Sequence, residues 1–115
     1  MNKICCFIGV GEKGFAWRYE KRETDWHRQY EELLSYILER DIVKNGYDRF
    51  ICGKDKGANA DFANAVSVLR AKYPQISLEI VDRITKKHLD SADKIFAVWN
   101  AQEKGKTFRV FVRKV

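Results

Sequence analysis

Residues 50–61 constrain the fold of this chain more than any other stretch. The apolar run Phe50–Cys52 stops at Gly53, and Gly53 and Gly57 enclose the lysines Lys54 and Lys56. Apolar residues then recur at helical spacing, at Ala60, Ala63, Val66 and Leu69. This order predicts a strand, a glycine-bearing turn and the N-terminus of a helix.

A junction of this kind can hold an anion, because unpaired backbone N–H groups and the positive end of the helix dipole point out of the turn. Lys54 and Lys56 would add positive charge. In the alternative interpretation, glycine ends the strand for purely steric reasons and the lysines lie on a solvated surface. The sequence is compatible with both.

Apolar runs and amphipathic stretches alternate along the rest of the chain. Residues 3–10 are expected to form an inner parallel strand buried on both faces, because the run Ile4–Ile8 has no polar alternation. Thr24 fits the N-cap of a helix that ends near Lys44, before Asn45–Gly46. Its apolar face is marked by Trp26, Tyr30, Leu33, Leu34, Ile37 and Leu38. A strand over 49–52 is expected next, then a helix that ends at 72 or 73 before Pro74 and a strand over 76–81 near a sheet edge. A short helix within 82–91, a strand over 94–99 and a loop over 100–107 follow. The tail 108–115 fits either a strand or one helical turn.

This alternation predicts one α/β domain over residues 1–115, with a mostly parallel sheet of about four or five strands and helices on both faces. In such sheets, ligands bind beyond the carboxyl ends of the strands, where the strand order reverses. The loops 9–14, 53–59 and 100–107 all follow expected strands. We therefore expect them to converge on one pocket.

The bulk composition favours anionic partners. The chain has 115 residues, a net charge of +6 and a pI near 9.3, which suits a nucleotide, a nucleic acid or an acidic protein surface. A solvated basic surface is the alternative, because the basic residues are scattered. No apolar run approaches the roughly 20 residues that cross a bilayer, and the opening residues are not expected to act as a signal peptide. A cytoplasmic protein without membrane contact is expected.

The three cysteines, Cys5, Cys6 and Cys52, are expected to be buried structural thiols. They show no metal-type spacing, and His27 and His88 lie far apart in the sequence. No metal site and no cofactor are predicted.

The loop after the first expected strand is rich in glycine. Gly9, Gly11 and Gly14 match the spacing G-x-G-x-x-G, but no helix pattern begins directly after them. A lone match of this kind is weak support for dinucleotide binding. Trp17 can stack on a base in this segment, or close the core as a lid.

Three stretches, in this order, resemble motifs of the SLOG superfamily, the Rossmann-like group that contains the Lonely Guy phosphoribohydrolases and the DprA proteins, and within it the YpsA-like branch. The opening Cys5–Gly9 resembles C-C-F-T-G, with Val10 and Gly11 in place of His-Arg. The second motif resembles F-I-x-G-x-x-x-G-x-D-x-x-A-A and is followed by Lys-Tyr-Pro, with Asn59 in place of Asp. The third resembles D-x-S-D-x-x-I-A-V-W-D-G followed by a G-T turn; it is matched by Asp90, Asp93, Ala97, Val98, Trp99, Gly105 and Thr107, with Asn100 and Ala101 at the D-G positions.

The resemblance implies a small Rossmann-like three-layer sandwich, here in reduced form. Related chains carry a further strand–helix unit before the last motif and a full helix and strand after the G-T turn. The phosphoribohydrolases use a glutamate shortly after their Gly-Thr, whereas Thr107 is followed by Phe108, Arg109 and Val110. The resemblance therefore argues for binding more than for hydrolysis.

The function expected from the sequence is non-catalytic binding of a nucleotide or nucleotide-derived ligand, sensing or sequestering it, with a homo-oligomer as a further expectation. No catalytic residues are assigned. The expected ligand-binding residues are Gly9, Val10, Gly11, Trp17, Gly53, Lys54, Lys56, Gly57, Asn59, Asn100, Gly105, Lys106 and Thr107.

Two alternatives stay open. The first is a phosphoribohydrolase-like enzyme acting on nucleoside monophosphates, with candidate carboxylates at Glu12, Asp55, Asp61 and Asp82. The second, less favoured, is single-stranded nucleic-acid binding through Lys86, Lys87, Arg109, Arg113 and Lys114.

Overall fold

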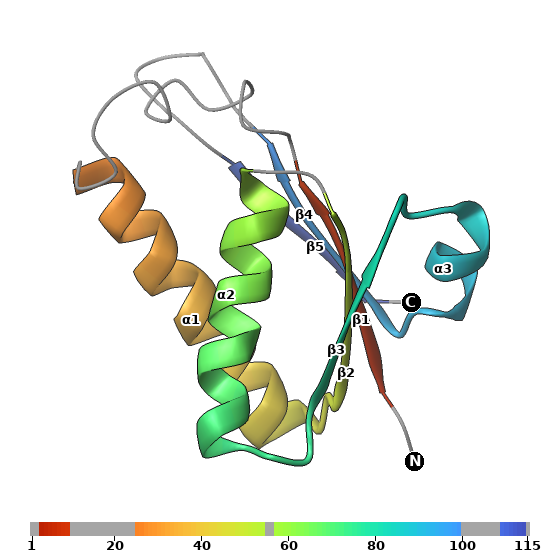
Figure 1. Cartoon of the computed structure of the whole chain (residues 1–115), viewed down its shortest axis with the longest axis horizontal. Coiled ribbons are helices and arrows are strands. Elements are labelled where there is room, and N and C mark those ends of the chain that lie inside the picture. Colours follow the sequence, from red (N-terminus) through yellow and green to blue (C-terminus); the bar gives the residue numbers. More distant parts are fainter. Residues whose placement is uncertain (1–2, 10–24, 55–56, 100–108, 115) are drawn as a thin grey trace.

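The computed structural model describes residues 3–9, 25–54, 57–99 and 109–114 (Figure 1). For residues 25–27, 98, 99 and 109–114, only the backbone is described. The elements are β1 (Ile4–Gly9), α1 (Asp25–Asn45), β2 (Arg49–Gly53), α2 (Ala58–Lys72), β3 (Ser77–Val81), α3 (Lys86–Ser91), β4 (Lys94–Trp99) and β5 (Arg109–Lys114).

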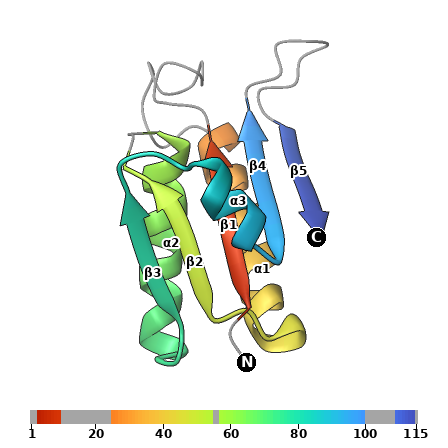
Figure 2. The same cartoon turned by 90° about the vertical axis from the view of Figure 1, so that its right-hand side faces the viewer.

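The strands form one five-stranded sheet in the order β3-β2-β1-β4-β5 (Figure 2). β1 pairs in parallel with β2 and with β4, and β2 pairs in parallel with β3. β5 pairs antiparallel with β4, with Lys94 opposite Lys114 and Trp99 opposite Arg109. The expected mostly parallel sheet is confirmed, and the tail adopts the strand rather than the helical turn.

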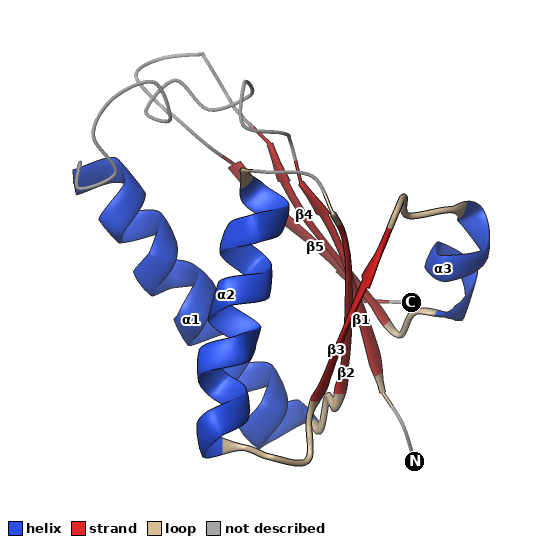
Figure 3. Cartoon of the chain, viewed as in Figure 1, coloured by secondary structure: helices blue, strands red, loops and turns tan. Residues whose placement is uncertain are grey.

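Helices cover both faces of the sheet, but unequally (Figure 3). α1 and α2, of 21 and 15 residues, lie side by side on one face, whereas the six-residue α3 is the only helix of the described residues on the other. The expected three-layer arrangement is therefore confirmed. The third layer is thin.

The main core lies between the sheet and the α1–α2 layer. On α1, the side chains of Tyr30, Leu34 and Leu38 are buried, at intervals of four residues. Leu33 was expected on this face, but it is 38% exposed. The buried stripe continues to Asp41 and Ile42. The stripe packs against aromatic and apolar side chains of β1, β2, α2 and β4: Phe7, Phe50, Phe62, Val66 and Phe96.

A second, smaller core lies under α3. Cys6, Ile51 and Ala92 form its buried centre. Cys5 and Cys52 point into the main core, so all three thiols are buried, as expected. Burial raises the pKa of Cys6 and of Cys52 to about 11, because the thiolate would lose its hydration.

The raised pKa values predict slow reaction of the native protein with an aromatic disulfide reagent. The pKa rises from 9.0 to about 11 for Cys6 and Cys52, so the thiolate fraction at pH 8 falls about 100-fold. We expect the native protein to react at least that much more slowly than the urea-unfolded protein. Rapid release of the coloured aromatic thiolate from the reagent by the native protein at pH 8 would contradict the burial of the cysteines.

Local backbone chemistry ends both long helices where the sequence predicts. After α1, Gly46 has a φ of +74°, the left-handed conformation that glycine adopts at a helix C-terminus. α2 ends at Lys72, and the N–H of Tyr73 donates to the carbonyl of Leu69 at 2.7 Å before Pro74. β3 is an edge strand, as expected, and Ile80 on it is 55% exposed.

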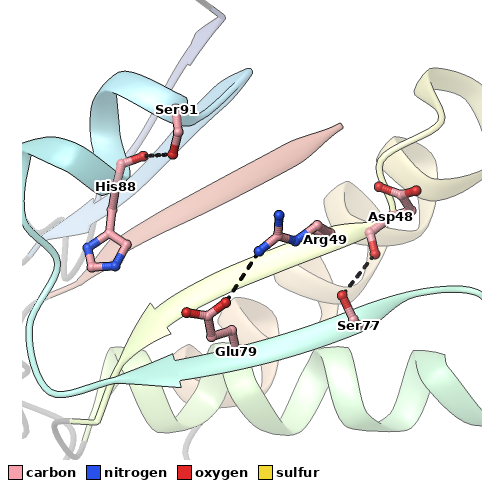
Figure 4. A network of polar contacts seen from close by, with 6 residues as sticks. All are labelled: Asp48, Arg49, Ser77, Glu79, His88 and Ser91. Carbon is pink, nitrogen blue, oxygen red and sulfur yellow. Dashed lines mark hydrogen bonds and ion pairs between the residues drawn. The ribbon is translucent and has the colours of Figure 1, made fainter. Parts of the chain in front are cut away.

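Polar contacts join β2 to β3 on the side where α3 lies (Figure 4). Arg49 Nη2 donates to Glu79 Oε1 at 3.3 Å, and Ser77 Oγ donates to the carbonyl of Asp48 at 3.4 Å. These contacts accompany the register in which Arg49 pairs with Ser77.

An ion pair between Asp41 and Lys94 is buried inside the main core. The Lys94 ammonium donates to Asp41 Oδ2, and both side chains are about 5% exposed or less. Asn45 Nδ2 donates to the other carboxylate oxygen at 3.2 Å. The ammonium also lies 5.7 Å from the ring centroid of Tyr47 and 5.9 Å from that of Phe96. Nothing in the sequence pattern indicated this pair.

Candidate functional site

The four parallel strands end at one edge of the sheet, the edge where α2 begins (Figure 1). The register places Gly9 beside Val98 and Gly53 beside Val81. The expected convergence of Gly9 and Gly53 at this edge is present in the structure.

The strand order reverses between β1 and β4. The chain moves from β1 to β2 and β3 through α1 and α2 on one face, then returns through α3 on the other face to β4 beside β1. In open α/β sheets, this position is where ligands bind. Several predicted site residues follow β1, β2 and β4 and lie outside the described residues: Val10, Gly11, Trp17, Lys56, Asn100, Gly105, Lys106 and Thr107.

Gly9 allows the end of β1 to approach the start of α2. A Cβ at this position would lie 2.5 Å from Ala58 Cβ and 2.6 Å from Phe7 Cε2. Contacts this short do not occur between real Cβ atoms, so a larger residue would push β1 and α2 apart. The close packing of β1 against α2 thus accounts for the glycine at position 9.

The backbone conformation at position 57 accounts for the glycine there. Gly57 precedes α2 with φ 93° and ψ −126°, a conformation that side chains disfavour. Its carbonyl accepts the first helical hydrogen bond, from the N–H of Asp61 at 3.0 Å. Gly57, the last residue of the predicted glycine turn, therefore leads directly into the helix.

Replacing Gly57 with alanine is expected to lower the free energy of unfolding by about 1–3 kcal/mol, because alanine is strained at this backbone conformation. Gly53→Ala is the matched control: a Cβ there would lie 3.7 Å from Asn59 Oδ1, an ordinary contact. It should stay within about 1 kcal/mol of the wild type. Urea denaturation of both variants measures the difference, and equal stabilities would contradict the strain at Gly57.

Asn59 ties the end of β2 to the first turn of α2. Its Oδ1 accepts a hydrogen bond from the N–H of Gly53 at 3.3 Å, and the residue is 5% exposed. Lys54 points to β3 instead, where its ammonium lies 3.3 Å from Asp82 Oδ1. That carboxylate partly neutralises a lysine that the sequence suggested as a partner for phosphate.

Two small hollows flank this junction. One, of about 160 Å³, is lined by Gly9, Gly53 and Asn59 together with Arg83 and the apolar side chains Phe7, Ile8 and Ile84. The other, of about 230 Å³, lies toward the edge strand and is lined by Gly53, Lys54, Asn59, Ala60, Ala63 and Ile80, among others. The structure thus brings together the predicted residues Gly9, Gly53 and Asn59, and places Lys54 at the second hollow only.

Sequence reasoning missed Arg83. It comes two residues after β3, in the loop that leads to α3, and lines the hollow beside Gly9 and Asn59. The available signal was a cation directly beyond the carboxyl end of a strand, where the other site residues were found.

None of the candidate carboxylates lines either hollow within the described part of the chain. Asp61 lines a separate hollow between α1 and α2. Asp82 is largely exposed and pairs with Lys54. Glu12 and Asp55 lie outside the described residues.

The candidate nucleic-acid residues are only partly placed. Lys86 and Lys87 are exposed on α3. Arg109, Arg113 and Lys114 lie on the edge strand β5, and their side chains are not among those described.

A larger hollow, of about 490 Å³, lies at the opposite edge of the sheet, between the C-terminal ends of α1 and α2. Its polar wall contains Glu39, whose carboxylate accepts hydrogen bonds from Lys72 and from the Tyr73 hydroxyl, each at 2.9 Å. The hydrogen bonds from Lys72 and Tyr73 lower the pKa of Glu39.

Over residues 3–9, 25–54, 57–99 and 109–114, no group of three or more histidine, cysteine or acidic side chains is arranged to hold a metal ion. Among the same residues, no helix is both long enough and apolar enough to span a bilayer.

Comparison of the chain with protein-family models, with curated proteins and with solved structures found no match.

Proposed function

We propose that this domain binds a nucleotide or nucleotide-derived ligand at the carboxyl ends of its parallel strands, and that it senses or sequesters the ligand without reacting with it. The observation that carries the proposal is the meeting of Gly9, Gly53 and Asn59 around one hollow at the start of α2. Two strand ends, one helix N-terminus and the loop before α3 supply its walls.

The physical support comes from the first turn of α2. The N–H groups at a helix N-terminus lack partners within the helix, and the helix dipole places partial positive charge there, so an anion is favoured. Gly57 and Ala58 are buried, and Asn59 lines both hollows. A ligand would therefore approach this turn through the hollows that Asn59 lines.

The resemblance to the SLOG superfamily supports the same ligand class, because its motifs coincide with the ends of β1, β2 and β4. Two observations favour binding over catalysis. The sequence lacks the glutamate of the phosphoribohydrolase turn after Thr107. In addition, neither described hollow at this edge has a carboxylate in its wall that could act as a general acid or base.

Isothermal titration calorimetry at low salt with ADP-ribose, NAD, AMP and cyclic nucleotides tests the proposal. We expect saturable binding of at least one of these compounds, and no adenine or ribose 5-phosphate after prolonged incubation with AMP. Absence of binding for the whole panel would count against nucleotide recognition. Release of free base would replace the binding function with the hydrolase alternative.

A further inference from the structure

The hollow beside Gly9 combines a buried amide and a cation. Asn59 is only 5% exposed, and its Oδ1 accepts a hydrogen bond from the N–H of Gly53. Its Nδ2 carries two further donors, and no described residue accepts from them. Because Asn59 lines the hollow, these donors are available to an acceptor group of a ligand.

The cation in this hollow is Arg83. Lys54 is engaged by Asp82 at 3.3 Å and lines only the other hollow, whereas Arg83 lines this one, and no acidic residue is among the described residues of its wall. An arginine presents a planar fork of N–H donors that stays charged at all physiological pH values and matches the oxygens of phosphate.

The size of the hollow limits what it can accept. Its volume is about 160 Å³, whereas pockets for whole small molecules measure about 300–1,000 Å³. It therefore suits one functional group of a larger ligand. The lining of one guanidinium, one amide and apolar walls selects an anionic group with several acceptor oxygens.

We propose that the hollow between the ends of β1 and β2 and the loop before α3 binds a phosphate monoester group, with Arg83 and the Asn59 amide as its ligands. This assignment deepens the proposed function and depends on it only for the identity of the rest of the ligand. Lys54 lines the neighbouring hollow and is not a ligand of the phosphate. A phosphorylated ligand binds tightly, and its dephosphorylated counterpart binds weakly.

The test uses the full chain and inorganic phosphate as the probe. ¹⁵N–¹H spectra follow the Asn59 side-chain NH₂ and the Arg83 Nε–H during a phosphate titration at constant ionic strength set with potassium chloride. We expect saturable shifts of both signals in the wild type. Arg83→Gln should raise the apparent Kd about 10- to 100-fold, because charge-assisted hydrogen bonds are lost. Arg70→Gln, which removes the same charge from the exposed last turn of α2, is the matched control and should leave the Kd unchanged.

A second variant and a second ligand pair separate the possible outcomes. Asn59→Asp keeps an oxygen for the Gly53 N–H but replaces the donors with negative charge, so the Asn59→Asp protein should lose phosphate binding while remaining folded by circular dichroism. Equal phosphate affinity of Arg83→Gln and Arg70→Gln would overturn the site.

Calorimetry with AMP and adenosine distinguishes a failure of the phosphate site from a failure of the proposed nucleotide binding. Weaker binding of adenosine than of AMP, with the difference removed by Arg83→Gln, supports the site. If the nucleotides bind the wild type and Arg83→Gln equally, nucleotide binding stands and the phosphate site falls. If phosphate shifts Asn59 and Arg83 but the whole nucleotide panel fails to bind, the site stands and nucleotide recognition falls.

Discussion

Replacing Asp41 with leucine is expected to lower the free energy of unfolding by about 3–5 kcal/mol, because the substitution leaves a charged ammonium in the core without a partner. Lys94 is 4% exposed, and Asp41 is its carboxylate partner in the described core. Urea denaturation followed by circular dichroism measures the loss. Single domains are stable by about 5–15 kcal/mol, so this one substitution removes a large part of the total.

The double variant Asp41→Leu/Lys94→Met separates an unpaired charge from a general packing defect. Apolar replacement of both partners of a buried ion pair is often neutral, so the double variant should recover most of the lost stability. Glu79→Gln serves as the control: it breaks the Arg49–Glu79 pair, whose side chains are 39% and 51% exposed. It should change stability by only about 0–1 kcal/mol. A double variant no more stable than Asp41→Leu would contradict this explanation.

Replacing Phe62 with alanine should also cost about 3–5 kcal/mol, through lost apolar burial and the cavity left behind. The Phe62 ring is fully buried and stacks on Phe7 with the centroids 4.3 Å apart, and it lies 6.2 Å from the ring of Phe50. It joins α2 to β1 and β2, one turn beyond the candidate site. Loss of this contact is therefore expected to loosen the junction at Asn59 as well as the core.

Val68→Ala is the control for Phe62→Ala. Val68 lies on the same helix but is 72% exposed, so its truncation should change stability by less than about 0.5 kcal/mol. Hydrogen exchange of the Gly53 amide reports on the junction directly, because that N–H donates to Asn59. Faster exchange in Phe62→Ala than in Val68→Ala is expected. Equal exchange in the two variants would show that the ring does not support the site.

The candidate site was predictable where it depends on short stretches of chain. Gly53, Gly57 and Asn59 lie within seven residues, and their roles follow from a strand that ends and a helix that begins. The sequence also placed Gly9 at the end of a parallel strand, hence at the same edge. It did not show that Gly9 contacts Ala58, because that approach depends on how α2 packs across β1.

Arg83 and Lys54 illustrate what the sequence left open at the site. Both are cations near the carboxyl ends of strands, and Lys54 fitted the phosphate role better because it sits in the glycine turn. The structure pairs Lys54 with Asp82 and places Arg83 in the hollow beside Asn59. Which cation serves a site depends on neighbours from other strands, and those are set by strand order.

The sequence by itself determined the local elements of this protein. Apolar runs define the strands, Gly46 ends α1 because glycine tolerates a positive φ, and Pro74 forbids continuation of α2. Only the tertiary structure decided the strand order β3-β2-β1-β4-β5, the exposure of Leu33, and the burial of Asp41 against Lys94, 53 residues away. The physical reason is range: backbone sterics and side-chain periodicity act over a few residues, whereas burial and charge pairing are set by elements that are distant in the chain.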